Sequence, residues 1–166
     1  MTITSSAATP AKRRARRAAT AACAWALLFA ALSFFWAAGG RTGIQPLEVS
    51  GADNVGLRIG ANVVAGLLKI GAGVAALALA RVGACHRLYR PLLAFAWLAG
   101  VGMCLYGGLG LISDILHVTG VVNDPATRHW FFWYLVVWDP WWLLGGALFV
   151  ATARLVGRAS GRGLRG

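Results

Sequence analysis

The sequence contains few acidic residues and none of the common catalytic motifs. Five acids stand among 166 residues, against 16 lysines and arginines. There is no Walker phosphate loop, no Gly-x-Ser-x-Gly, no His-Glu-x-x-His and no Cys-x-x-Cys. The recognisable motifs of nucleotide hydrolysis, serine or zinc proteolysis and disulfide exchange are therefore missing. Cys23, Cys85 and Cys104 fall in the first apolar run, the middle loop and the third run, with no two on the oxidising side of the membrane, so we expect three free thiols.

Two further absences concern the apolar parts of the chain. No histidine lies inside an apolar run, which argues against haem ligation within a membrane. The first apolar run also has no acid, whereas four-helix multidrug exporters carry an essential glutamate in their first helix. Neither class of membrane protein is therefore expected.

What the chain does contain is apolar sequence in long runs. Hydrophobic residues make up 58% of it, well above the roughly 45–50% of soluble domains. Four runs, at about residues 18–38, 56–80, 91–116 and 130–156, are each long enough to cross a hydrocarbon core of roughly 30 Å as a helix. The sequence predicts an all-α membrane protein, a bundle of four transmembrane helices.

The membrane domain is expected at residues 18–157, between a disordered basic tail at 1–17 and a second basic tail at 158–166. Ala37-Ala38-Gly39 resembles a signal-peptide cleavage site. The first run nevertheless exceeds the usual apolar length of about 7–15 residues in signal peptides, and three more runs follow. We therefore expect the first run to be retained as a membrane anchor.

The basic residues predict the orientation. They gather in alternate flanks of the apolar runs: Lys12, Arg13, Arg14, Arg16 and Arg17; then Arg81, Arg87 and Arg90; then Arg154, Arg158, Arg162 and Arg165. By the positive-inside rule, both termini and the middle loop are cytoplasmic, in a multi-pass protein of the cell membrane. Anionic lipid headgroups are the expected partner of this charge. Nucleic acid is not expected, because no basic stripe alternates with aromatic residues on a soluble face.

The last run is interrupted by Asp139-Pro140, which is typical of a helix start. Either one long helix kinks there, or a surface segment precedes a shorter span; the sequence favours a break at 139–140. With a break, Asp139 lies near the outer headgroups. In a continuous helix it lies roughly 13 Å deeper.

Small residues four positions apart predict close helix contacts, because helices in lipid associate by packing. The third run has Ala96, Gly100, Cys104 and Gly108 on one ladder. The second has three shorter sets: Gly56 and Gly60; Ala61 and Ala65; and Ala72, Ala76 and Ala80. Packing within one chain is the simpler interpretation. A homo-oligomer is the alternative.

Lys69 lies inside the second apolar run, on the same helical face as Arg58 and Asn62. A lysine at mid-span costs about 2.5–3.5 kcal/mol on insertion scales, so it needs a partner or water. Asp139 and Asp114 are the candidate partners. The group forms either a pair that fixes helix register or a site for a substrate or ion.

Tryptophans gather at the outward ends of the first and last runs: Trp36, Trp133, Trp138, Trp141 and Trp142. Such residues commonly form an interfacial belt. The alternative is an outward pocket for an amphipathic molecule, above Lys69 and Asp139.

A metal site is only weakly indicated. Asp114 and His117 are three residues apart, and Asp124 and His129 follow in the next loop, so oxygen and nitrogen ligands could converge. We expect no metal and no cofactor.

Two stretches resemble a known family: Phe34-Phe35-Trp36-Ala37-Ala38-Gly39-Gly40 and Trp138-Asp139-Pro140-Trp141-Trp142-Leu143-Leu144-Gly145-Gly146. They are similar to a bacterial family of small four-helix membrane proteins catalogued only as a domain of unknown function. The resemblance covers about residues 24–155. It implies the four-span architecture and supplies no activity, cofactor or catalytic residue.

The sequence favours a non-enzymatic membrane protein with a structural or accessory role. A small transporter or binder of an amphipathic ligand, using Lys69 and Asp139, is the alternative. An enzyme ranks third.

Overall fold

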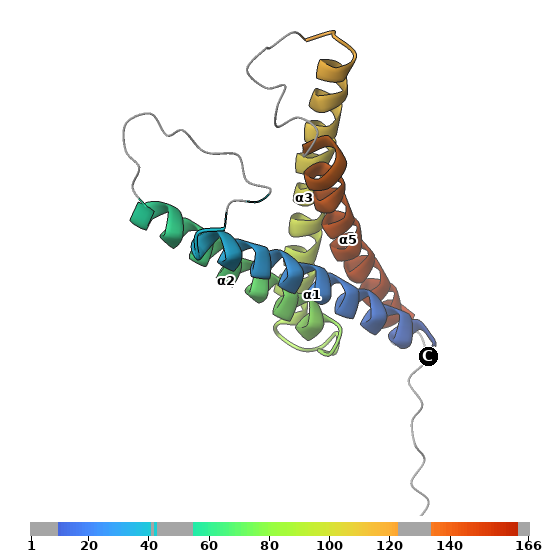
Figure 1. Cartoon of the computed structure of the whole chain (residues 1–166). Coiled ribbons are helices and arrows are strands. Elements are labelled where there is room, and N and C mark those ends of the chain that lie inside the picture. Colours follow the sequence, from blue (N-terminus) through green and yellow to red (C-terminus); the bar gives the residue numbers. More distant parts are fainter. Residues whose placement is uncertain (1–9, 41, 43–54, 123–133, 163–166) are drawn as a thin grey trace, which may run out of the picture.

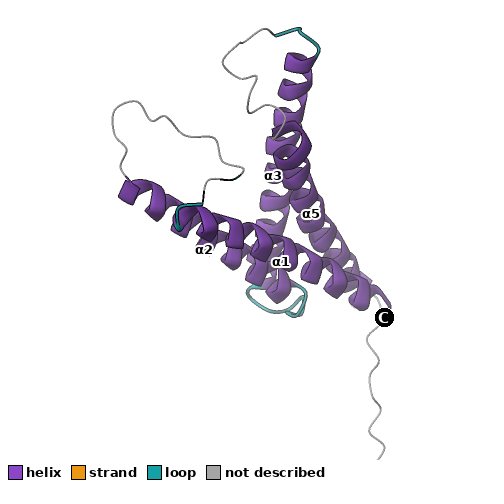
Figure 2. Cartoon of the chain, viewed as in Figure 1, coloured by secondary structure: helices purple, strands orange, loops and turns teal. Residues whose placement is uncertain are grey.

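The computed structural model describes residues 10–40, 42, 55–122 and 134–162. Four long helices dominate them: α1 (Pro10–Ala37), α2 (Val55–Leu79), α3 (Tyr89–Val118) and α5 (Asp139–Arg162), the last preceded by a π-helical turn, η1 (Tyr134–Trp138) (Figures 1 and 2). The candidate spans, with η1 joined to α5 in the fourth, are long and apolar enough to cross a membrane. This confirms an all-α chain with four candidate spans.

Two boundaries differ from the expectation. Helix α1 begins at Pro10, so residues 10–17, predicted to be disordered, are helical. Proline suits the first helical position, and the alanines, lysine and arginines that follow are strong helix formers. Ala15 is already buried there. Helix α5 likewise continues to Arg162, into the predicted C-terminal tail, whereas residues 1–9 and 163–166 lie outside the described residues.

The helices form two hairpins and not a closed bundle. Helix α1 packs along α2, α3 packs along α5, and the hairpins are joined mainly through α1 and α5. The hairpins meet at the end that holds the start of α1, the α2–α3 connection and the end of α5, here called the convergent end (Figure 1). Toward the other end they diverge, and large apolar side chains all along α2 and α3 are exposed within the chain.

The fourth span corrects the break expected at 139–140. The chain is helical from Tyr134 onward, with π geometry in η1 and α geometry from Asp139. Pro140 has no N–H for the carbonyl four residues earlier, and its ring would crowd that carbonyl in a regular α-helix. The wider π-helical turn relieves the crowding, so the helix changes geometry and does not stop. Residues 130–133 of the predicted span are outside the described residues.

Glycines bring α3 and α5 together. Gly100 and Gly107 are buried on α3, and a side chain on Gly146 of α5 would collide with the backbone of α3. The ladder predicted through Gly100 therefore faces α5. Farther along the helix, the close contact with α5 is made by Gly107 and not by the predicted Gly108.

On α2 the ladder is only partly used. Of the predicted residues, Ala76 is buried, whereas Gly56 and Gly60 are exposed; Gly66 and Gly73, which were not predicted, are buried as well. Small residues thus serve packing within one chain along the inner half of α2.

Candidate functional site

Lys69 is attached to α1. Its Nζ donates a hydrogen bond to Oγ of Ser33 at 2.8 Å and lies 4.1 Å from the centroid of the Phe29 ring. Ser33 is 1% exposed, and its hydroxyl in turn donates to the carbonyl oxygen of Phe29 at 3.3 Å. Lys69 therefore faces the protein interior, where its charge is met by one hydroxyl and one aromatic face.

The aspartates expected beside Lys69 lie elsewhere. Among the described residues, Lys69 forms no ion pair with Asp114 or Asp139; those two carboxyl groups face each other. Arg58 is exposed, and Nδ2 of Asn62 donates a hydrogen bond to the backbone oxygen of Arg58 at 3.0 Å. Neither residue therefore joins Lys69 in a common site. The periodicity of the sequence predicted that Lys69 faces the interior. It could not predict the partner of Lys69, because Ser33 belongs to another helix.

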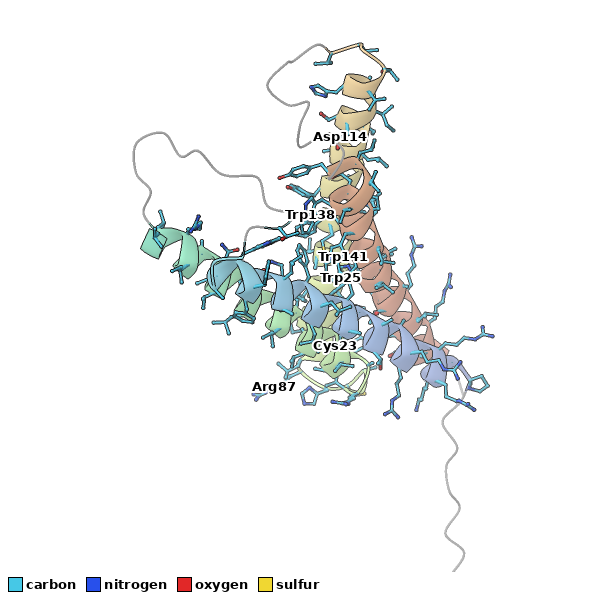
Figure 3. All side chains as sticks on the ribbon, viewed as in Figure 1. Cys23, Trp25, Arg87, Asp114, Trp138 and Trp141 are labelled. Atoms are coloured by element: carbon cyan, nitrogen blue, oxygen red, sulfur yellow. The ribbon has the colours of Figure 1, made fainter. Side chains whose placement is uncertain are left out.

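The aromatic cluster, Trp25, Phe29, Trp36, Trp138, Trp141 and Trp142, joins α1 to η1 and α5. Trp25 is at its centre: its Nε1 donates to the Trp141 carbonyl oxygen at 3.1 Å, and its ring centroid is 5.4 Å from that of Phe29. Figure 3 shows Trp25, Trp138 and Trp141 together where α1 meets α5. The cluster therefore fills the junction of the two hairpins.

The edges of the aromatic cluster are also closed by ring contacts. Trp36 and Trp138 have centroids 5.3 Å apart, and Trp142 is 4.9 Å from Phe29 and 5.1 Å from Tyr106. Separations of about 4.5–7 Å are those of packed aromatic pairs. Four of the five predicted tryptophans thus come together as packing between helices.

The fifth predicted tryptophan, Trp133, lies outside the described residues. Trp25 and Phe29 were not among the predicted site residues. Their spacing of four, continued by Ser33, places them on one face of α1. That periodicity was the available signal.

Asp139 and Asp114 form an acid pair between α5 and α3. Asp139 is only 3% exposed, and the two carboxyl groups lie within hydrogen-bonding range of each other. Gly110 makes room for them, because a Cβ there would lie 2.5 Å from Oδ1 of Asp139. Oδ2 of each aspartate is buried and receives no hydrogen bond in the described structure. Asp114 lies near the divergent end of α3 (Figure 3).

The weakly indicated metal ligands do not gather in the part of the chain that is described. No three histidine, cysteine or acidic side chains converge among those residues. The Nδ1 atom of His117 is 2.8 Å from the Ser113 carbonyl oxygen. Asp124 and His129 lie outside the described residues.

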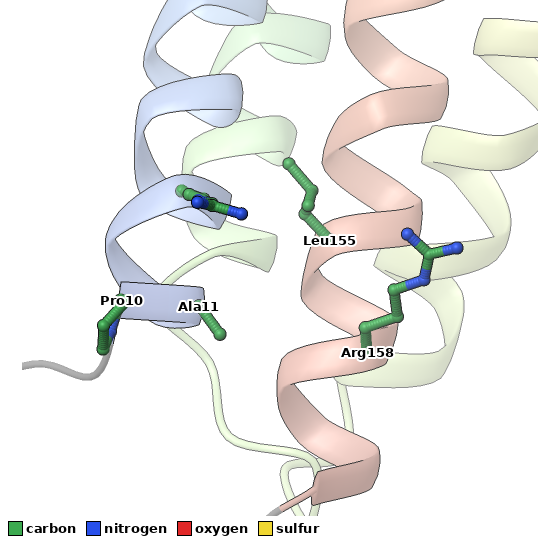
Figure 4. Close-up of a pocket in the computed structure, with 5 residues that line it drawn as sticks. Pro10, Ala11, Leu155 and Arg158 are labelled. Carbon is green, nitrogen blue, oxygen red and sulfur yellow. The ribbon is translucent and has the colours of Figure 1, made fainter.

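The convergent end carries a basic pocket. A cavity of about 240 Å³ is lined by Pro10, Ala11, Arg14, Leu155 and Arg158, none of them acidic (Figure 4). The first turn of α1 has no acidic residue, so its free N–H groups add to the positive potential. Two arginines and an apolar wall suit an amphipathic anion.

The thiols are free, as expected. Cys23 is buried, Cys104 is partly buried and Cys85 is exposed in the α2–α3 connection. The three thiols therefore differ in their exposure to solvent and should differ in their reactivity toward thiol reagents.

Comparison with known proteins identifies the family of the chain. No curated protein and no solved structure gives a significant match. The family model described as "Protein of unknown function (DUF3995)" matches residues 7–149, which include both stretches that carry the resemblance. The expected family is confirmed: the chain belongs to the DUF3995 family of proteins of unknown function.

Proposed function

We propose that this chain is a non-enzymatic, multi-pass protein of the cell membrane with a structural or accessory role. The observation that carries the proposal is the attachment of Lys69 to Ser33 and Phe29 of α1. A desolvated cation over an aromatic ring gains about 2 kcal/mol, and interhelical hydrogen bonds in membranes add about 0.6–2 kcal/mol. These contacts together match or exceed the cost of about 2.5–3.5 kcal/mol of placing a lysine in the span, so Lys69 serves to hold α1 against α2.

The packed aromatic cluster supports the same role. A transporter or binder of an amphipathic ligand would need space between the tryptophans above Lys69 and Asp139. Instead the rings contact one another, and the Trp25 indole is fixed by a hydrogen bond to α5. Rings packed in this way connect helices.

The convergent end is the part that we place against the cytoplasmic leaflet. The basic residues at the start of α1, in the α2–α3 connection and at the end of α5 are brought to this one end (Figure 1). A phospholipid phosphate at Arg14 and Arg158, with an acyl chain along Leu155, would match the pocket in charge and shape. Both termini are then cytoplasmic.

The proposal is tested by thermal unfolding of the purified chain in mild detergent, with a screen of lipids and small amphipathic molecules. We expect Lys69→Met to lower the unfolding temperature and no small amphipathic molecule to raise that of the wild type. Arg58→Met, at an exposed position on the same helix, is the matched control and should change little. An amphipathic molecule that stabilises the wild type but not a folded Lys69→Met variant would instead establish a binding site.

A further inference from the structure

The acid pair of Asp114 and Asp139 has a chemistry that helix packing alone does not explain. Each Oδ2 atom is buried and meets no N–H or O–H donor among the described residues. What each carboxyl group meets is the other carboxyl group, within hydrogen-bonding range. An ionised carboxylate only accepts hydrogen bonds, so this contact becomes a hydrogen bond only when one of the two groups carries a proton.

The backbone of α3 forces the two groups together. Asp139 is 3% exposed and lies against Gly110, one turn before Asp114 on the same face of α3. A Cβ added at Gly107 would likewise lie 2.8 Å from the backbone oxygen of Asp139, so α5 approaches α3 closely at this position too. The Asp139 carboxyl group therefore cannot turn toward bulk water without moving α5 away from α3, whereas Asp114 is only partly buried.

No basic side chain neutralises the pair in the described structure. Lys69 is bound to Ser33, and no lysine or arginine forms an ion pair with either aspartate there. The other titratable groups at the site are His117 of α3, which acts on Asp114, and Tyr134 of η1, which both aspartates and Tyr106 act on. Two negative charges at this separation inside a helix interface would repel each other strongly.

We propose that Asp114 and Asp139 bind one exchangeable proton between them, as a cation site that joins α3 to α5. On binding, a proton from water forms an O–H bond to one carboxylate, and this O–H donates to the other. The pair then holds a single negative charge. Asp114 is only partly buried, so the proton can exchange with water at the divergent end of the helices.

A proton fits this site better than a metal cation. Calcium takes about six to eight oxygen ligands, whereas two carboxyl groups supply at most four. No third histidine, cysteine or acidic side chain joins the pair among the described residues. A proton needs only the two oxygens that already face each other.

The test is the equilibrium unfolding of the purified full-length chain in mild detergent between pH 5 and pH 9. The folded pair holds its proton more tightly than the separated carboxyl groups of the unfolded chain, so stability is present at low pH and is lost as pH rises. We expect the unfolding equilibrium constant of the wild type to increase by about tenfold or more over this range. In Asp114→Asn and in Asp139→Asn, the amide N–H₂ takes the place of the shared proton. We expect the unfolding equilibrium constant of these variants to change by less than about twofold over the same pH range.

Two controls separate this site from its neighbours. His117→Gln should keep the loss of stability at high pH, because the proton lies between the aspartates. Sodium chloride at pH 9 should stabilise the wild type no more than choline chloride at equal ionic strength; a specific sodium effect would assign the site to a metal cation and overturn the proton.

A wild type with unchanged stability from pH 5 to pH 9, or a pH dependence that both asparagine variants retain, would also overturn the proposal. Infrared difference spectra give an independent readout. The C=O stretch of a protonated carboxyl group should appear in the wild type and be absent from both asparagine variants. These outcomes do not depend on Lys69, so they are distinct from the test of the structural role.

Discussion

Replacing Gly107 by alanine is expected to force α3 and α5 apart. A Cβ at this position would lie 2.8 Å from the backbone oxygen of Asp139, 2.9 Å from Cβ of Trp142 and 3.1 Å from the backbone N of Leu143. Carbon contacts are favourable at about 3.5–4.0 Å, so α5 would have to move by roughly 0.7 Å. The contacted atoms belong to backbone and Cβ positions, which no side-chain rotation can remove.

Gly102→Ala is the matched control. Gly102 is exposed on the same helix, and a Cβ added there would meet no atom within 4 Å. Both substitutions gain the same helix propensity, up to about 1 kcal/mol, and this gain cancels when the two variants are compared. Overpacking then leaves Gly107→Ala less stable than Gly102→Ala by about 1–3 kcal/mol.

The measurement is reversible unfolding of both variants in mixed detergent micelles, followed by tryptophan fluorescence. Each 1.4 kcal/mol changes the unfolding equilibrium constant by about tenfold, so the expected difference is readily measured. Equal stability of the two variants would refute the close approach of α3 and α5 at Gly107.

Three further predictions concern other parts of the molecule. Trp25→Phe removes the indole hydrogen bond to the Trp141 carbonyl oxygen of α5, so unfolding in micelles should become easier by about 0.5–1.5 kcal/mol. Cys85 should react with a membrane-impermeant maleimide only after permeabilisation of the cell, whereas buried Cys23 should stay unreacted until unfolding; labelling of Cys85 in intact cells would reverse the proposed orientation. Arg158→Gln should weaken binding to vesicles of anionic phospholipid more than Arg81→Gln does, because only Arg158 lines the basic pocket; equal losses would indicate general charge attraction.

The sequence predicted those features that depend on one helix at a time. The length of the apolar runs identified the four spans, and the helical period of 3.6 residues correctly predicted that Lys69 faces the interior. The ladder through Gly100 correctly marked the face of α3 that packs closely. These features follow from local geometry, since side chains three or four residues apart share a helix face.

Features that depend on how helices meet could not be predicted in the same way. Aspartates were the expected partners of Lys69 because opposite charges attract, but the hairpin of α1 and α2 brings Ser33 and Phe29 to it. The outward tryptophans were expected as a belt or a pocket; where α1 crosses α5, Trp138 is buried and Trp36, Trp141 and Trp142 are half-buried against the same core. The start of α1 at Pro10 was missed because basic residues were interpreted as a disordered tail, although they also favour helix.

The central claim is that Lys69 holds α1 against α2 through Ser33. Two double-mutant cycles in detergent test it, one combining Lys69→Met with Ser33→Ala and the other combining Lys69→Met with Asp139→Asn. We predict a coupling energy of about 1 kcal/mol or more in the first cycle and additivity within about 0.5 kcal/mol in the second. Additivity with Ser33 together with strong coupling to Asp139 would contradict the account.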